Sequence, residues 1–193
     1  MPTNVLLWSD GAGPYIDAIA AAGLKDRVNV EVLPRSERPS QAQKASTEVM
    51  LGWGAPKGLL PEMTGLKWVQ ALTAGVEMWL TLPDLPAGLT LTCARGTHRE
   101  SMPENIVGGL FHLTKPYALA NQDQQASKWT RRMATPLSGQ TLGILGVGEI
   151  GARVAKIASA IGMRVIGTKR RPEPTECVEA VLPTERTDEV LAQ

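Results

Sequence analysis

Three glycines in the second half of the chain have the spacing with which a backbone holds a diphosphate. They belong to one string of the form G-x-G-x-x-G. In such a string the first glycine permits a tight turn from strand to helix, the second lets the backbone approach a pyrophosphate, and the third lets the helix pack closely on the strand. Free amides and the positive end of the helix dipole attract the anion. The candidate cofactor-binding residues are Gly146, Val147, Gly148, Glu149, Ile150 and Gly151.

Three spaced glycines are a weak signal in a chain that contains 19 of them. The string is therefore evidence for dinucleotide binding only if the flanking segments form a strand before it and a helix after it. Thr141–Leu145 precedes it as an apolar strand, and Met163–Gly167 follows as a second strand after Gly162 closes the helix. Apolar residues at helical spacing lie between the strands: Ile150, Val154, Ile157, Ala158 and Ile161. The segment predicts the β-turn-α-β unit of a Rossmann-type dinucleotide-binding domain. The alternative is a glycine-rich turn that binds nothing.

A basic string follows the second strand. Asp or Glu at this position usually binds the adenosine ribose of NAD, whereas a basic residue accommodates the 2′-phosphate of NADP. Here the chain reads Thr168-Lys169-Arg170-Arg171, and the nearest carboxylate, Glu173, comes only after Pro172. Lys169, Arg170 and Arg171 therefore favour NADP over NAD as the cofactor. The alternative is that they form a solvated basic turn.

The first half of the chain alternates short apolar runs with helix-like or turn-like segments, which is typical of a parallel α/β layer. Tyr15–Leu24 is an expected helix after the breaker cluster Gly11-Ala12-Gly13-Pro14. Five strands with crossovers predict a small doubly wound domain. The expected strands are Asn4–Trp8, Val28–Leu33, Glu48–Leu51, Lys67–Leu72 and Leu89–Cys93.

A helix is expected between the two halves. Ser101-Met102-Pro103-Glu104 has the spacing of a capping box, so the helix should start there. Pro116 should end or kink it, and the polar run Asn121–Lys128 should lead out of it. A third strand of the second half is expected at Val178–Leu182. The predicted domains are residues 1–100 and 101–193.

Composition excludes several classes of protein. Lys+Arg total 20 against 19 Asp+Glu, so the chain has no broad basic surface for nucleic acid or for an anionic membrane. Its first residues lack the pattern of a secretory signal, and no apolar run reaches the ~20 residues that a bilayer span needs. Cys93 and Cys177 lack metal-ligand spacing and fit reduced thiols. We expect a cytoplasmic protein without a metal site.

Several strings resemble the D-isomer-specific 2-hydroxyacid dehydrogenase family. Leu137 to Gly151, followed by Gly162 to Gly167, is similar to the family's dinucleotide string. Gln70 to Glu77 is similar to its substrate loop, Arg95 to Glu104 resembles its hinge, and Trp129 falls where the family often has Trp. The matches occur in the family's order.

The resemblance implies a flavodoxin-like N-terminal substrate domain, an interdomain helix and a truncated Rossmann-type domain, with cofactor and substrate meeting in a cleft. The implied reaction transfers a hydride between NAD(P)H and a small 2-oxo or 2-hydroxy acid such as glyoxylate or hydroxypyruvate. Amides at Ala74, Gly75 and Val76 would hold the substrate carboxylate, and Leu51 to Gly54 would line the pocket. An ordinary turn and a packing loop are the alternative. The implied substrate-binding residues are Gly52, Trp53, Gly54, Ala74, Gly75 and Val76.

The family's catalytic Arg, Glu and His lie downstream of the strand ending near Gly167, so none is carried over to this chain. His98 is expected in a turn and His112 at a helix boundary, and neither is assigned as a general acid. We expect the chain either to be a fragment or to associate with another copy that covers its apolar edge. The resemblance implies a homodimer. A non-catalytic dinucleotide-binding or corepressor-like module remains the alternative function.

Overall fold

The computed structural model describes all 193 residues, and the chain divides into two compact units, Met1–Arg95 and Gly96–Gln193. The sequence suggested a boundary at residues 100 and 101. The second unit begins slightly earlier because the residues before that boundary form the turn that opens its first helix, where the Met102 amide donates to the His98 carbonyl. None of the helices combines the length and the hydropathy that crossing a membrane requires.

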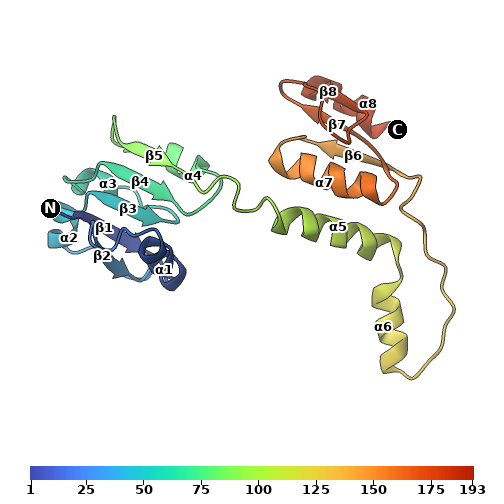
Figure 1. The fold of residues 1–193 in the computed structure, drawn as a ribbon, viewed down its shortest axis with the longest axis horizontal. Helices are drawn as coiled ribbons and strands as arrows, with labels where there is room; N and C mark the ends of the chain where they lie inside the picture. Colours follow the sequence, from blue (N-terminus) through green and yellow to red (C-terminus); the bar gives the residue numbers. More distant parts are fainter. The chain divides into compact units, whose positions relative to one another are not determined.

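The first unit contains a five-stranded, fully parallel sheet (Figure 1). Its order, β2-β1-β3-β4-β5, is the flavodoxin-like order and confirms the expected doubly wound α/β fold. The strands are β1 Thr3–Trp8, β2 Val28–Leu33, β3 Val49–Gly52, β4 Trp68–Ala71 and β5 Thr90–Thr92. The helices are α1 Gly13–Ala21, α2 Gln41–Ser46, α3 Leu59–Glu62 and α4 Glu77–Leu80.

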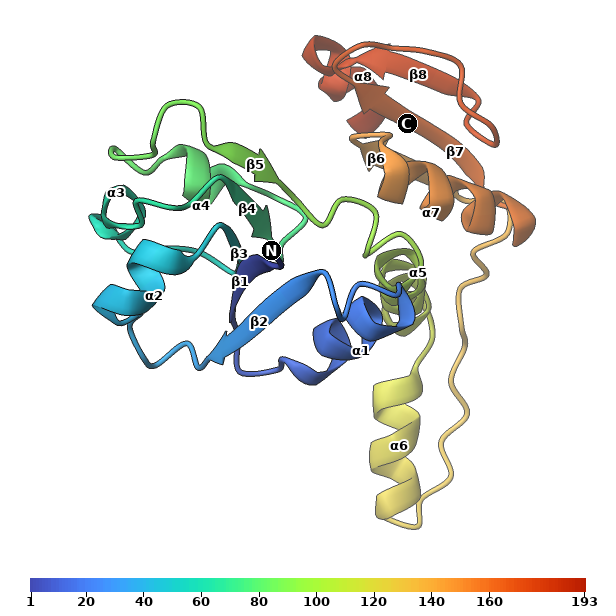
Figure 2. The same cartoon turned by 60° about the vertical axis from the view of Figure 1, so that its left-hand side comes forward.

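The core of the first unit explains why its strands could be found in the sequence. Consecutive residues of the central strands are buried, as along β1 from Val5 to Trp8, and Leu6 and Met50 pack with helical residues such as Leu60 and Trp79. A parallel strand covered on its faces carries a continuous apolar run. Figure 2 shows α1 on the opposite side of the sheet from α2 and α3, as right-handed crossovers from β1 to β2 and from β2 to β3 require.

The second unit is built on a three-stranded parallel sheet of order β6-β7-β8. Its strands are β6 Thr141–Leu145, β7 Arg164–Lys169 and β8 Ala180–Pro183. Its helices are α5 Ser101–Thr114, α6 Tyr117–Gln125, α7 Glu149–Ala160 and α8 Thr187–Leu191, with a 3₁₀ turn at Thr184–Arg186 before α8. Leu110 and Phe111 of α5 pack against buried alanines of α7, and Figure 1 shows these two helices side by side.

The predicted capping box of α5 is wrong. Ser101 is already helical, and the residue before it, Glu100, holds the cap position without a side-chain cap hydrogen bond. The Glu100 carboxylate instead accepts hydrogen bonds from Arg153 of α7 at 2.8 and 3.2 Å. A capping box does occur at α2, where Ser40 and Gln43 cap each other's backbone. The helix thus begins at Ser101 as expected, but without the expected capping box.

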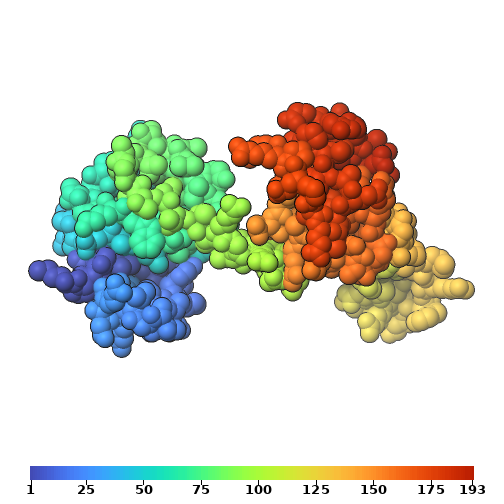
Figure 3. Space-filling model, turned by 45° about the horizontal axis from the view of Figure 1, so that its top comes forward, coloured from blue at the N-terminus to red at the C-terminus, as the bar shows by residue number.

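The polar run Asn121–Lys128, which was expected to lead out of α5, instead begins within a second helix, α6 Tyr117–Gln125. Pro116 ends α5 as expected and also stands at the N-cap of α6, where its missing amide removes no helical hydrogen bond. The alanines and glutamines of this segment have high intrinsic helix propensity, which outweighs its polarity. Figure 3 shows α6 and the chain that follows it, in yellow, at the surface of the second unit.

Two boundaries differ in smaller ways. The helix expected at Tyr15–Leu24 begins at Gly13, because Pro14 fits the first helical turn. The strand expected at Met163–Gly167 continues to Lys169, because Thr168 and Lys169 pair in register with Leu182 and Pro183 of β8.

Candidate functional site

The turn between β6 and α7 is fixed by a glycine with positive φ and by two backbone hydrogen bonds. Gly146 has φ of +102°, a conformation that side chains disfavour, and this permits the sharp reversal after Leu145. The amides of Gly146 and Val147 donate to the Thr168 carbonyl at 3.0 and 2.8 Å. Because Thr168 lies on β7, these hydrogen bonds fix the turn at the carboxyl end of the sheet.

The other two glycines of the string have opposite surroundings. A Cβ at Gly151 would lie 2.6 Å from the Gly146 carbonyl oxygen and 3.1 Å from a methyl group of Ile144, so α7 packs on β6 too closely for any side chain. A Cβ at Gly148 would meet nothing within 4 Å. The backbone at Gly148 is thus open on the side where a ligand would approach it.

Helix α7 begins directly after this open position, with Gly148 as its N-cap. No intramolecular hydrogen bond is present from the amides of Glu149 and Ile150, as expected for the first turn of a helix. Such amides, with the positive end of the helix dipole, form a site for an anionic group. The Gly148 amide donates to the Gly146 carbonyl at 2.9 Å, so the free amides of Glu149 and Ile150 are the ones that can bind phosphate oxygens without any charged side chain.

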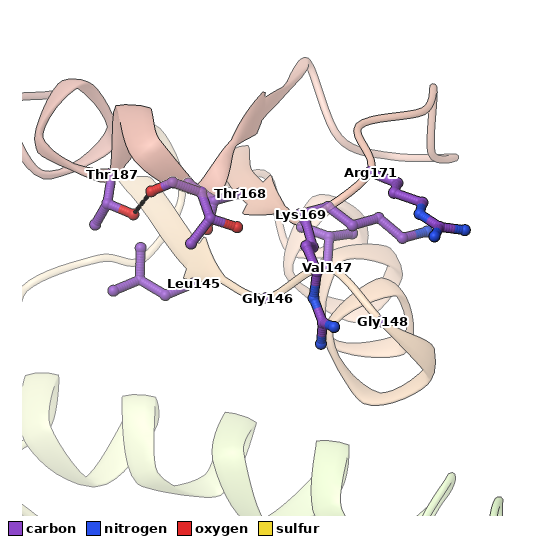
Figure 4. Close-up of a pocket in the computed structure, with 10 residues that line it drawn as sticks. Leu145, Gly146, Val147, Gly148, Thr168, Lys169, Arg171 and Thr187 are labelled. Atoms are coloured by element: carbon purple, nitrogen blue, oxygen red, sulfur yellow. Dashed lines mark hydrogen bonds between the residues drawn. The ribbon is translucent and has the colours of Figure 1, made fainter.

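A pocket of ≈ 840 Å³ lies over this turn (Figure 4). This volume falls in the upper part of the range of ~300–1,000 Å³ that is usual for cofactor sites. One wall comes from the chain after β8, where the Thr187 hydroxyl donates to the Thr184 carbonyl at 2.7 Å. The pocket is lined by Leu145, Gly146, Val147, Gly148, Thr168, Lys169, Arg170, Arg171, Thr184 and Thr187. The turn and the basic string thus face one cavity.

The three cations of the basic string are not equivalent. Lys169 forms an ion pair with Glu173, and this lysine holds the pKa of the Glu173 carboxyl below its usual value. Arg170 and Arg171 are exposed and form no ion pair in the structure. Glu173, which the sequence placed only as the nearest carboxylate, therefore neutralises the lysine and leaves the two arginines for an external anion.

The implied substrate loop lies in the first unit, between β4 and α4. Its residues Ala74, Gly75 and Val76 follow the carboxyl end of β4, and no intramolecular hydrogen bond is present from their amides. The Thr73 hydroxyl donates to the Gly75 carbonyl at 2.5 Å and holds the loop in a turn. The amides have no partner within the chain, but the Glu77 carboxylate lies against Gly75, and the loop remains compatible with an ordinary strand-to-helix connection.

The other implied substrate residues divide between a pocket and the sheet. Trp53 and Gly54 line a second cavity, of ≈ 270 Å³, whereas Gly52 is the last residue of β3 and does not line it. This cavity, which we call the tryptophan pocket, is lined by Trp8, Arg35, Trp53, Gly54, Ala55, Pro56 and Met78. Arg35 was not identified from the sequence, although its position two residues after β2 is the kind of strand-end position that supplies binding groups.

Neither histidine belongs to these pockets. His98 lies in the turn before α5, and His112 lies in the last turn of α5. The ten residues around the turn of the second unit include no Asp, Glu or His, and neither do the residues around the tryptophan pocket. The groups that these pockets present are backbone amides, hydroxyls and cations, which bind anions.

The comparisons with known proteins agree on one family. The family model described as "D-isomer specific 2-hydroxyacid dehydrogenase, NAD binding domain" matches residues 107–193. A putative 2-hydroxyacid dehydrogenase of Haemophilus influenzae is 31% identical over 142 residues, which cover 69% of this chain and 44% of that protein.

Solved structures support the same grouping. A D-isomer specific 2-hydroxyacid dehydrogenase family protein from Aeromonas salmonicida has a TM-score of 0.84 and 25% identity, covering 100% of this chain and 62% of that one. An NADPH-dependent glyoxylate/hydroxypyruvate reductase from Sinorhizobium meliloti, in complex with NADP and sulfate, has a TM-score of 0.76 and 23% identity, covering 98% and 59%. This chain therefore spans less than two thirds of the length of each of these proteins.

Proposed function

Because this chain belongs to the D-isomer-specific 2-hydroxyacid dehydrogenase family, we propose that it serves to transfer a hydride between NADPH and a small 2-oxo acid, giving the 2-hydroxy acid. The observation that carries this proposal is the pocket of the second unit, in which the open backbone at Gly148 and the arginines Arg170 and Arg171 face one cavity. A diphosphate and a further phosphate are the groups that such a cavity fits.

Each part of the pocket has a separate task in this proposal. The amides of Glu149 and Ile150 would hold the pyrophosphate where the open Gly148 backbone lets it approach, and Arg170 with Arg171 would bind the 2′-phosphate that distinguishes NADPH from NADH. The bound nicotinamide supplies the hydride. In the first unit, the amides of Ala74 to Val76 would orient the carboxylate of the 2-oxo acid.

Glyoxylate and hydroxypyruvate are the proposed substrates, in line with the activity named for the Sinorhizobium meliloti reductase. Because this chain spans less than two thirds of these relatives, the test uses the full-length protein, and mixing it with NADPH and either acid is expected to consume NADPH. A second candidate is a dinucleotide-binding module without catalysis, which is favoured by the lack of Asp, Glu and His around both pockets. NADPH binding without any consumption would support this second candidate instead.

Replacing Arg170 and Arg171 together by Ala is expected to weaken NADPH binding by at least about tenfold, since hydrogen bonds to a charged group contribute ~1.5–3 kcal/mol. Binding of NADH, which lacks the 2′-phosphate, should change little. Titration followed by nicotinamide fluorescence measures both affinities. Arg131→Ala, in the segment before β6 and outside the pocket, is the control. Equal losses for NADPH and NADH would contradict the assignment of these arginines.

We further propose that two copies of the chain associate through the segment that runs from α5 to residue 136. Three of its large apolar side chains are almost fully exposed: Leu113 at 83%, Trp129 at 94% and Met133 at 84%. Large exposed apolar groups in one segment are typical of a protein interface. Sedimentation equilibrium should give a mass of two chains for the unchanged protein. The double variant Trp129→Ser, Met133→Ser should give the mass of a single chain. A monomer at micromolar concentration would contradict the dimer.

A further inference from the structure

One of the three cations around the pocket of the second unit is already paired with a carboxylate. Lys169, Arg170 and Arg171 all line this pocket, and its lining contains no Asp or Glu. Among these cations only Lys169 forms an ion pair, and its partner is Glu173. The carboxylate that compensates part of the positive charge of the pocket therefore comes from outside its wall.

The backbone around Glu173 restricts where this carboxylate can lie. Arg171 precedes Pro172 and Glu173 precedes Pro174, and a residue before proline is restricted to extended conformations. The ring of each proline also fixes its own φ. The Thr175 hydroxyl donates to the Glu173 carbonyl at 3.3 Å. The chain directly after β7 therefore has few conformations available to it.

Two further ion pairs fasten the same loop, which runs from β7 to β8. Glu176 pairs with Lys156 of α7 at 3.5 Å, and Glu179 pairs with Arg164 of β7 at 2.8 Å. Neither of these two cations lines the pocket. The neighbouring lysine holds the pKa of the Glu173 carboxyl below its usual value, so this carboxylate is charged at neutral pH. Of the three glutamates, only Glu173 acts on a cation of the pocket.

Glu173 acts on a bound nucleotide through Lys169 rather than by direct contact. In an NAD-binding domain the carboxylate that binds the adenosine ribose is part of the cofactor site. Glu173 does not line this pocket; together with Pro172 and Pro174 it lines a neighbouring cavity of ≈ 310 Å³. The Glu173 side chain is 65% exposed, so water can solvate its carboxylate when the lysine leaves it.

A phosphate group can displace a carboxylate from such an ion pair. Ion pairs between exposed side chains contribute little free energy, because water and salt screen them. A phosphate monoester carries about −1.5 to −2 charges near pH 7 and has three acceptor oxygens. The lysine side chain is a compact charge on a flexible stem, so it can turn from one anion to another. A phosphate bound by Arg170 and Arg171 would therefore attract Lys169 away from Glu173.

We propose that Glu173 lowers the affinity of the second unit for NADPH by holding Lys169 as its counterion. The 2′-phosphate releases this lysine and binds it as a third cation beside Arg170 and Arg171. The inference rests on the proposed function, because it takes the phosphate to be that of NADPH. It adds a positioning residue: Glu173 sets how strongly the pocket prefers NADPH to NADH.

Glu173→Gln removes the charge of this side chain and keeps its size. The variant of the 193-residue protein is expected to bind NADPH about three- to tenfold more tightly than the unchanged protein, because Lys169 no longer has to leave a carboxylate. Its affinity for NADH, which lacks the 2′-phosphate, should change by less than about twofold. Titration followed by nicotinamide fluorescence measures both affinities.

Two more variants show whether the effect passes through Lys169. Glu176→Gln makes the same change in the same loop, at a carboxylate whose partner Lys156 lies outside the pocket, and should leave both affinities unchanged. The double variant Lys169→Gln, Glu173→Gln should lose the gain in NADPH affinity. In the unchanged protein the Cε carbon resonance of Lys169 should shift on binding NADPH and much less on binding NADH.

The inference and the proposed function fail in different ways. If the unchanged protein binds NADPH, three results would overturn the inference alone: no gain for Glu173→Gln, an equal gain for NADH, or a gain that persists without Lys169. If the unchanged protein binds neither nucleotide, the proposed function fails and the inference fails with it.

Discussion

Gly148→Val is expected to reduce NADPH affinity by about 100-fold or more without unfolding the protein. Gly148 has φ of −98° and ψ of −156°, an extended backbone that valine readily adopts. A Cβ there meets no protein atom within 4 Å, so the added methyl groups would fill only the space that the pyrophosphate needs. Losing two amide contacts of ~1.5 kcal/mol each lowers affinity by about two orders of magnitude.

Calorimetric titration of the Gly148→Val variant with NADPH measures the loss of affinity, and a thermal melt of the same variant measures any loss of stability. The melting temperature should stay within about 2 °C of the unchanged protein, since no native contact is lost. Gly148→Ala, with one added carbon, should show an intermediate loss of affinity. If Gly148→Val bound NADPH normally, the diphosphate would not lie against this backbone.

Gly151→Ala is expected to destabilise the second unit by roughly 1–3 kcal/mol, which is the usual cost of forcing extra carbon into a packed site. Its Cβ would lie 2.6 Å from the Gly146 carbonyl oxygen, a backbone atom that cannot swing aside. Helix α7 would have to move away from β6. In a unit of this size each kcal/mol lowers the melting temperature by about 4–8 °C.

Gly108→Ala in α5 is the matched control, because it makes the same change at a position where a Cβ meets nothing within 4 Å. Alanine in a helix interior is favoured over glycine by about 0.5–1 kcal/mol. The two substitutions should therefore shift stability in opposite directions, as scanning calorimetry can show. A neutral Gly151→Ala would mean that α7 does not rest closely on β6.

The order of elements followed well from the sequence because short apolar or alternating runs mark the strands. Val28–Leu33 was predicted with its observed bounds, and Thr141–Leu145 likewise. An apolar run such as Thr141–Leu145, or an alternating run such as Val28–Leu33, can be seen without knowing what covers it. The glycine string was identified through its flanking strands, and the structure shows the need for glycine at Gly146, which has a positive φ, and at Gly151, where a Cβ has no room.

Features that depend on distant partners could not be found in this way. The Glu100 carboxylate pairs with Arg153 of α7, 53 positions away, and such a partner cannot be found from the local Ser101-to-Glu104 pattern. The polar composition of α6 concealed a helix because helix propensity and hydrophobicity are separate properties.

The sequence predicted those residues of the candidate site that are contiguous in the chain, and it missed those that come from distant segments. The backbone string and Lys169 to Arg171 are contiguous, and the pocket does contain them. Thr184 and Thr187 come from the chain after another strand, and Arg35 is brought to the tryptophan pocket only by the hydrogen bonds of Trp8. The pairing of Lys169 with Glu173 depends on how the chain turns after β7.

An amide-resolved NMR titration of the 193-residue protein with NADPH tests the central claim most directly. The account predicts saturable binding, with the largest shifts at the amides of Gly146 to Gly151 and further shifts at Arg170 and Arg171 that NADH does not reproduce. Saturable binding that leaves the amides of Gly148, Glu149 and Ile150 unchanged, or no binding at millimolar NADPH, would contradict it.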